Sequence, residues 1–201
     1  GLEDKCEKIN IEGVRIAKKV AAGKALVAAS MGPCGELLEP IGPFSFDDAY
    51  EEFALQAKLF EKAGADLISI ETMMDIQEAR AAVIAAKQNT KLPVIVHLTY
   101  DSNQKTNTGT PPEVAVCVFE ELGADAIGAN CSTGPKDMLK LAERFMNIAK
   151  IPVSIVSNAG NPELIADQTV YKMKPNEFAK YAKKFARIGV KFIGGCCGTG
   201  P

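Results

Sequence analysis

Three short stretches that resemble one another constrain the fold of this chain more than any other feature. Gly64, Gly123 and Gly189 each follow a segment with helical spacing of apolar residues, and an apolar run begins almost at once after each glycine. Glycine readily adopts the conformation that ends a helix, and such a run is typical of a buried strand. The tripeptide Gly-Ala-Asp begins at Gly64 and again at Gly123, and the third copy is weaker. The sequence therefore predicts a repeated helix-to-strand joint, as in a parallel α/β protein.

Strands and helices alternate along the whole chain. The predicted strands are 25–30, 66–71, 93–100, 125–130, 152–158 and 190–195. The predicted helices are 2–22, 46–63, 75–89, 112–122, 136–149 and 175–188, with Ser45 as an N-cap before the second. The strands are continuous apolar runs, which is typical of parallel strands covered by helices.

Two architectures fit six strands separated by helices. A closed (β/α)8 barrel has eight strands and typically about 250 residues. An open doubly wound sheet suits six strands and a chain of 201 residues. The first strand-to-helix turn lacks the Gly-x-Gly-x-x-Gly fingerprint of dinucleotide-binding sheets. The pattern favours the barrel and leaves the open sheet as the alternative.

The composition is that of an ordinary globular protein, with 47% hydrophobic and 24% charged residues. A formal net charge of -2 argues against a nucleic-acid partner, which requires a concentrated basic surface. We find neither an apolar stretch of about 18 residues, as a membrane span requires, nor a secretory signal. We therefore expect a cytoplasmic protein, in which clustered cysteines more often serve metal binding or catalysis than disulfides.

Polar side chains lie at the carboxyl ends of the predicted strands. Glu71, His97 and Asn158 each lie at or near a strand end, and Asn130 is followed directly by Cys131. The carboxyl ends of parallel strands lie on one face of the fold, where active sites are built. We therefore expect these residues to converge, although they are far apart in the sequence.

Cys131, Cys196 and Cys197 follow two of these strand ends and are the main candidates for a metal site. Zn²⁺ prefers soft thiolate ligands, and three of them can occupy three corners of a tetrahedron. A structural zinc site needs a fourth protein ligand and usually uses Cys-x-x-Cys pairs, which this chain lacks. The pattern therefore predicts an open, catalytic zinc site. Two alternatives remain: packing as small apolar residues, or a strained disulfide within the adjacent pair.

The motifs around these cysteines resemble the paired signature of the homocysteine S-methyltransferase family. The resemblance spans essentially the whole chain and is strongest to the homocysteine-binding modules of cobalamin-dependent methionine synthases. The segments that carry it are Gly128-Ala129-Asn130-Cys131, Gly194-Gly195-Cys196-Cys197-Gly198-Thr199, Met31-Gly32-Pro33, Gly35-Glu36, Ile41-Gly42, Glu71-Thr72, Thr108-Gly109-Thr110 and Asn158-Ala159-Gly160.

The resemblance implies a (β/α)8 TIM-type barrel, here a fragment that lacks the first two strands and the last helix. Residues 1–201 are then one homocysteine-binding domain, incomplete at both ends, with unpaired sheet edges at 25–30 and 190–195. We expect such a fragment to lack part of the substrate pocket and to be inactive by itself.

The resemblance also implies a reaction, namely zinc-dependent methylation of the homocysteine thiol to give methionine. Methylcobalamin is the implied methyl donor, bound to a separate module. The partners are homocysteine and the cobalamin-binding and folate-binding modules of a full-length protein, with no nucleic acid and no membrane.

Three other polar residues each have a functional and a structural interpretation. Glu71 can bind the ammonium group of the substrate, or its carboxylate can accept hydrogen bonds from the following helix. Asn158 can supply a weak fourth ligand to the metal, or it can make a hydrogen bond within its loop. His97, the only histidine, is interpreted as a buried residue with satisfied nitrogens rather than as a ligand or base. Cys34 is assigned no role.

Two rival functions remain open. The same fold can use betaine, S-methylmethionine or S-adenosylmethionine as the methyl donor, and the cysteines do not distinguish these because they bind the acceptor. A nonenzymatic metal-binding or thiol-redox domain is the rival from another class.

Overall fold

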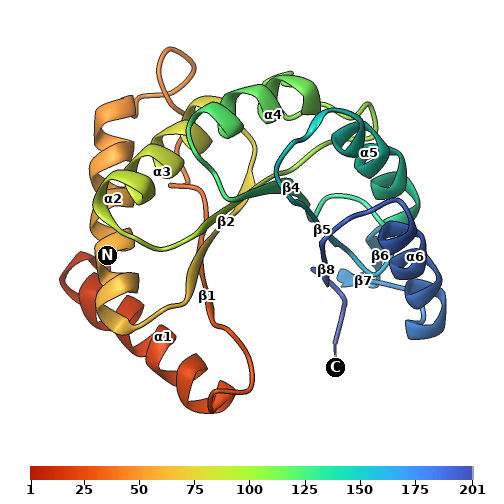
Figure 1. The fold of residues 1–201 in the computed structure, drawn as a ribbon, viewed down its shortest axis with the longest axis horizontal. Helices are drawn as coiled ribbons and strands as arrows, with labels where there is room; N and C mark the ends of the chain where they lie inside the picture. Colours follow the sequence, from red (N-terminus) through yellow and green to blue (C-terminus); the bar gives the residue numbers. More distant parts are fainter. Residues whose placement is uncertain (201) are drawn as a thin grey trace.

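The computed structural model describes residues 1–200, apart from the side chain of Glu3. A parallel sheet curls into an arc, and the helices lie along its outer face (Figure 1). The helices are α1 (Cys6–Ala21), α2 (Phe46–Ala63), α3 (Ile76–Asn89), α4 (Pro112–Glu121), α5 (Pro135–Ile148) and α6 (Pro175–Arg187), and a 3-10 turn, η1 (Glu3–Lys5), precedes α1. The strands are β1 (Ala28–Met31), β2 (Leu67–Met73), β3 (Val94–Leu98), β4 (Ala126–Asn130), β5 (Val153–Ser157), β6 (Glu163–Ile165), β7 (Gln168–Val170) and β8 (Phe192–Gly195).

The order of the strands decides between the two predicted architectures. The main sheet has six strands in the order β1-β2-β3-β4-β5-β8, and every neighbouring pair is parallel. Each strand of the main sheet therefore lies beside the next strand of that sheet along the chain. A doubly wound sheet, in contrast, reverses its order at a switch point. Together with helices on one side only, this order gives a curled α/β sheet of the TIM-barrel type (Figure 1).

The repeated glycine joints form as predicted. Gly64, Gly123 and Gly189 have φ angles of 87°, 78° and 100°, a region that side chains with a Cβ rarely adopt. α2 begins and ends where the sequence predicts, and the Ser45 side chain caps it by accepting a hydrogen bond from the Asp48 N–H.

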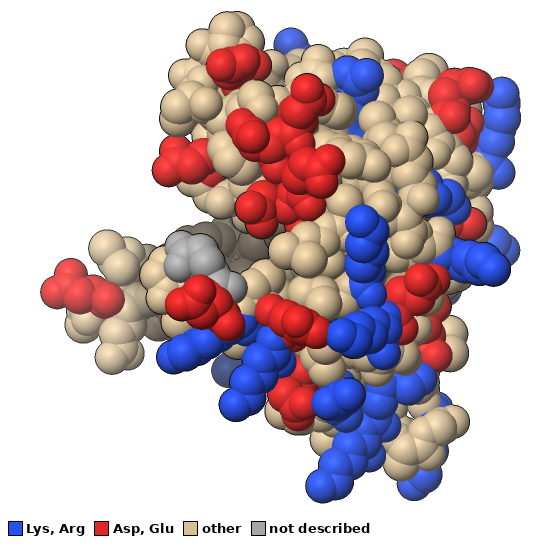
Figure 2. Space-filling view, turned by 90° about the vertical axis from the view of Figure 1, so that its left-hand side faces the viewer, with Lys and Arg blue, Asp and Glu red and all other residues tan. Residues whose placement is uncertain are grey.

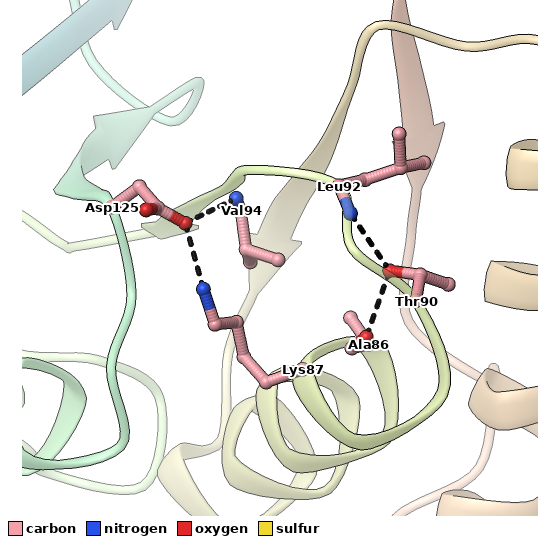
Figure 3. Close-up of polar contacts among 6 residues, drawn as sticks. All are labelled: Ala86, Lys87, Thr90, Leu92, Val94 and Asp125. Carbon is pink, nitrogen blue, oxygen red and sulfur yellow. Dashed lines mark hydrogen bonds and ion pairs between the residues drawn. The ribbon is translucent and has the colours of Figure 1, made fainter.

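The aspartates of the repeated joints link the start of their own strand to the start of the preceding strand and to the helix before that strand. The Asp125 carboxylate accepts hydrogen bonds from the Val94 N–H at 2.8 Å and from Lys87 Nζ at 3.0 Å (Figure 3). Asp66 does the same two units earlier, with the Val27 N–H at 2.6 Å and Lys18 Nζ at 2.9 Å. One short sequence motif therefore builds two equivalent junctions at the amino ends of the strands.

The two faces of the sheet differ in polarity, which the interpretation of the strands as continuous apolar runs did not anticipate. Ile70, Val96, Ile127 and Ile155 face the helices and are completely buried. The alternating positions on the inner face include Ser69, His97, Asn130 and Ser154, which are also buried. The inner face of the sheet therefore carries buried polar side chains.

Residues 159–174, for which the sequence predicts neither a helix nor a strand, are partly regular. They contain the antiparallel hairpin β6–β7, in which Glu163 pairs with Val170 and Ile165 with Gln168. Most of the hairpin is exposed, so no buried apolar alternation marks it in the sequence.

β1 and β8 are the two edge strands of the main sheet, as predicted. Phe192 and Ile193 on β8 are 46% and 37% exposed, although both are large and apolar. Such edges are a liability for association. Within the described residues, no helix is both long enough and apolar enough to cross a membrane.

Charges are unevenly distributed on the side of the molecule formed by α1 and α2. Acidic side chains gather in the upper part of this view, and Lys and Arg gather in the lower part (Figure 2). α2 contributes to this separation with Asp47 and Asp48 in its first turn and Lys62 in its last. This order of charges complements the helix dipole.

Candidate metal centre

The structure brings Cys131, Cys196 and Cys197 together. Cys131 directly follows β4, and the adjacent pair directly follows β8, with β5 between these strands. The three Sγ atoms lie within 4.8 Å of one another, and those of Cys131 and Cys197 are 3.6 Å apart. All three cysteines are free thiols, so the adjacent pair forms no disulfide here. Convergence of strand ends therefore assembles a three-sulfur cluster, as the sequence predicts.

The end of β5 holds both cysteine segments in place. The Cys131 N–H donates to the Val156 carbonyl at 3.0 Å, and the Cys196 N–H donates to the Ser157 carbonyl at 2.8 Å. These bonds continue the parallel ladders on both sides of β5. Cys131 itself has a φ of 59°, an uncommon conformation for a residue with a side chain. The register of the sheet thus fixes where the two motifs meet.

Asn158 contacts this cluster through its side chain. It is buried, and its Oδ1 accepts a hydrogen bond from the Cys197 N–H at 3.1 Å. The neighbouring Ala159 N–H donates to the Cys197 carbonyl at 2.9 Å. Asn158 therefore makes the loop hydrogen bond that the sequence leaves as one of its two interpretations, and its amide lies beside the cysteine pair.

The thiols are crowded, and this affects their acidity. Burial, followed by the neighbouring Cys131 and Cys197, raises the pKa of the Cys196 thiol to about 12. Three thiolates cannot form side by side without a compensating positive charge. Closely spaced soft sulfur donors of this kind fit Zn²⁺, whose binding deprotonates a coordinating thiol.

Glu71 lies within β2, two strands away from Cys131. The residue after it, Thr72, has a φ of 62° and is held by the Asn130 side chain. Asn130 Oδ1 accepts from the Thr72 N–H, and its Nδ2 donates to Thr72 Oγ1, both at 2.8 Å. The start of α3 is capped by Asp75, which accepts from the Gln77 N–H. Glu71 is therefore not the N-cap of the following helix.

His97 is buried and satisfied, as the sequence analysis interprets it. Its Nε2 lies 2.8 Å from Ser154 Oγ and its Nδ1 lies 3.3 Å from the Ile70 carbonyl. Because a carbonyl only accepts, Nδ1 carries the proton of the neutral ring and Nε2 accepts from the Ser154 hydroxyl. Burial lowers the pKa of His97 to about 4. His97 therefore links β2, β3 and β5 and lies outside the sulfur cluster.

The His97–Ser154 contact depends on a glycine between them. Gly128 of β4 pairs with His97 on one side and with Ser154 on the other. A Cβ at Gly128 would lie 1.6 Å from the Ser154 carbonyl oxygen. Only glycine allows β4 and β5 to approach so closely here, with the imidazole reaching across.

Cys34 is tied to a carboxylate and not to the sulfur cluster. Its N–H donates to Glu78 Oε1 at 2.7 Å. Burial, followed by the nearby Glu78, raises the pKa of the Cys34 thiol to about 12. This thiol stays protonated at neutral pH, which suits a structural role in the loop between β1 and α2.

Tyr171 is a neighbour of the cluster that the sequence analysis missed. It follows β7, and its hydroxyl is hydrogen-bonded to Cys197. Burial and, after it, this bond raise the pKa of Tyr171. Its segment looks like an ordinary polar loop in the sequence, and only the position of the hairpin brings it to the site.

Comparison with known proteins decides the family. The sequence profile described as homocysteine S-methyltransferase matches residues 1–201. The chain belongs to the homocysteine S-methyltransferase family. Methionine synthase from Mycobacterium leprae (strain TN) is 35% identical over 215 residues, a match that covers 100% of this chain and 18% of that protein. Methionine synthase from Mycobacterium tuberculosis (strain ATCC 25618 / H37Rv) is 34% identical, with the same coverage. This family member thus spans 18% of the length of those relatives.

Solved structures support the fold of this homocysteine S-methyltransferase family member. The apo form of the homocysteine methyltransferase MmuM from Escherichia coli superposes with a TM-score of 0.79 at 21% identity, covering 98% of this chain and 70% of that one. Its metallated form gives 0.76 at 20% identity, covering 96% and 67%. Likeness at this level of identity shows a shared architecture, which agrees with the curled parallel sheet described above.

Proposed function

We propose that this chain is the homocysteine-binding part of an enzyme that transfers a methyl group to the thiol of homocysteine and so forms methionine. The observation that carries the proposal is the cluster of three sulfur atoms within 4.8 Å at the ends of two strands. Membership of the homocysteine S-methyltransferase family supports the acceptor and the reaction.

Cys131, Cys196 and Cys197 would hold Zn²⁺. In the described residues the potential ligand cluster consists of these three cysteines alone. Three protein ligands are typical of catalytic zinc sites, which keep one position open for water or substrate. When bound, zinc would keep the thiol of homocysteine deprotonated and fixed in place, whereas a free thiol with a pKa of about 8.5 is mostly protonated at pH 7.

Other side chains of the chain would bind the rest of the substrate. Glu71, near the carboxyl end of β2, is our candidate partner for the ammonium group. Asn158, whose amide lies beside the cysteine pair, is our candidate for a weak ligand that homocysteine displaces. Its Oδ1 has two acceptor positions, so the bond from the Cys197 N–H leaves one of them free for this role.

The methyl donor we propose is methylcobalamin, carried and recharged by separate cobalamin-binding and folate-binding modules. The methionine synthases that match this chain extend far beyond the matched 18%, which is consistent with further modules. We place the reaction in the cytoplasm, where thiols stay reduced.

Metal analysis of a cysteine variant tests this proposal. We expect the reduced chain to bind one zinc ion, and homocysteine to change the absorption of its Co²⁺-substituted form. In Cys131→Ser we expect zinc affinity to fall by roughly a hundredfold or more, because one of three ligands is lost. Methyl transfer by the full-length enzyme should fall with it.

Cys117→Ser is the matched control, since Cys117 is an exposed free thiol on α4. It should keep both zinc and activity. A fully reduced chain without zinc, or a Cys131→Ser variant with unchanged zinc content, would contradict the proposal. Zinc binding without any response to homocysteine would favour a nonenzymatic metal-binding or thiol-redox domain instead.

A further inference from the structure

Tyr171 packs against the turn that carries the cysteine pair. A Cβ at Gly198 would lie 2.2 Å from Cγ of Tyr171 and 2.4 Å from its Cβ. These atoms belong to the base of the side chain, so the ring cannot move aside without its backbone. Gly198 also has a φ of 77°, which a residue with a side chain rarely adopts. Only glycine at position 198 therefore allows Tyr171 to pack directly on the turn after Cys197.

The backbone around Tyr171 is fastened to the same turn. The Met173 N–H donates to the Ala159 carbonyl at 3.2 Å, and the Ala159 N–H donates to the Cys197 carbonyl at 2.9 Å. One residue thus bridges the Tyr171 segment and the metal-binding cysteine. On the other side, Lys172 forms an ion pair with Glu163, which closes the ends of the β6–β7 hairpin. The hydrogen bond of Met173 and the ion pair of Lys172 therefore both fix the backbone that carries Tyr171.

The side chain of Tyr171 lies beside the sulfur cluster. Its pKa is raised by burial and, after that, by a hydrogen bond with the Cys197 side chain and by the proximity of Cys131 and Cys196. A hydrogen bond to a thiolate favours the charged form of the sulfur, which is the form that binds a metal. Partners of this kind orient the ligand and tune the metal.

We propose that Tyr171 is a positioning residue of the metal centre, whose ring fixes the Cys197–Gly198 turn and whose hydroxyl sets the strength of the Cys197 sulfur as a ligand. This inference rests on the proposed function, because it assumes that the cluster binds zinc. The proposal also assigns a role to the β6–β7 hairpin, which would position Tyr171 beside the cysteine pair.

Two substitutions separate the ring from the hydroxyl. Tyr171→Phe keeps the packing on Gly198 and removes only the hydrogen bond, and Tyr171→Ala removes both. We expect zinc affinity, measured by competition with a chromogenic chelator, to fall about tenfold in Tyr171→Phe and more in Tyr171→Ala, within the 10–100-fold range typical of such partners. The sulfur-to-metal charge-transfer band of the Co²⁺-substituted protein should shift in Tyr171→Phe, which a purely structural role would not cause.

Tyr181→Phe is the matched control, because Tyr181 lies on α6 and stacks with Lys184. It should leave both measurements unchanged. If Tyr171→Phe binds zinc within twofold of the unsubstituted chain and its Co²⁺ spectrum is the same, Tyr171 has no such role. If the unsubstituted chain itself binds no zinc, the proposed function fails first, so the two failures are distinguishable.

Discussion

The two ends of the parallel strands are built in opposite ways. At the amino ends, Asp66 and Asp125 make the same pair of contacts, one with an N–H at or just before the start of the preceding strand and one with a lysine of the helix before that strand. At the carboxyl ends the side chains differ from strand to strand, and the backbone is irregular: Cys131 after β4 has a φ of 59° and Thr72 near the end of β2 a φ of 62°. The repeated contacts lie at the amino ends of the strands and stabilise the fold. The irregular backbone lies at the carboxyl ends, where the candidate site is.

This difference has a physical origin. Every joint that only connects a helix to the next strand has the same geometry, so the same residues can form it in each unit. A site needs different side chains at different points, and their positions force some backbone into sparsely populated conformations. Changes at the amino ends should therefore alter stability alone, whereas changes at the carboxyl ends should alter metal binding.

Gly128→Ala tests whether the two ends are independent, and we expect it to have the largest effect on stability. Its Cβ would lie 1.6 Å from a backbone oxygen of β5, so β4 and β5 would have to separate. Overpacking of this kind costs about 3 kcal/mol or more when the backbone must move. Since β4 and β5 also hold the cysteines, zinc affinity should fall together with the denaturation midpoint.

Ala129→Gly, at the neighbouring position, is the comparison variant, because it adds no atoms. It should weaken the protein by a smaller amount and leave zinc affinity nearly unchanged. A Gly128→Ala protein of normal stability would show that the close approach of β4 and β5 is not required.

His97, on the inner face of the curled sheet, should make stability depend on pH. Its pKa is about 4 in the folded chain, against an ordinary value of 6.5, because burial disfavours the charged ring. As pH falls from 6.5 towards 4, the unfolded chain takes up a proton that the folded chain does not. Stability should therefore decrease through this window by up to about 3 kcal/mol and be insensitive to His97 above it.

The variant His97→Gln isolates this effect, since the chain has no other histidine. Urea unfolding at several pH values should show a smaller loss between pH 6.5 and 5 in the variant than in the unsubstituted chain. Glu78, whose pKa is raised by burial, acts in the opposite direction and is present in both proteins. Parallel curves for the two proteins would contradict the assignment of a neutral, buried His97.

The sequence predicts the regular part of the fold well because regular parts have local causes. The glycine joints at Gly64, Gly123 and Gly189 depend on the conformation of single residues, and each one forms as expected. The hairpin β6–β7 could not be predicted in this way, because its side chains are exposed and follow no pattern of burial. The polarity of the inner face was also missed, since apolar helix-facing residues dominate the short strands.

The candidate site is predictable to the extent that it follows from strand ends. Cys131, Cys196 and Cys197 meet because their strands flank β5, which the order of the repeated units already implies. A hydrogen bond of Asn158 within its loop is one of the two interpretations from the sequence, and only the structure identifies its partner as the Cys197 N–H. Tyr171 could not be predicted from the sequence. It reaches the cysteines only through the β6–β7 hairpin, and it belongs to no motif that contains them.

Asp125→Ala tests the amino ends and should have a moderate effect. It removes the acceptor for the Val94 N–H and for Lys87 at the same time (Figure 3). A buried amide that loses its partner costs about 1–3 kcal/mol, and we expect a value near the lower end because the Asp125 side chain is 47% exposed. Zinc affinity should be unchanged, which would distinguish this end from the other. A clear loss of zinc in Asp125→Ala would show that the two ends are coupled.

Lys87→Met separates the two contacts of Asp125 and should have the smallest effect. It removes the ion pair but keeps the aliphatic chain and leaves the Val94 N–H bonded to the carboxylate. Lys87 and Asp125 are 32% and 47% exposed, and ion pairs in such positions contribute about 0–1 kcal/mol. We expect a loss of about 0.5 kcal/mol or less in urea unfolding, and one that shrinks further at high salt. A loss as large as that of Asp125→Ala would mean that the lysine, rather than the backbone hydrogen bond, is the main contact of the joint.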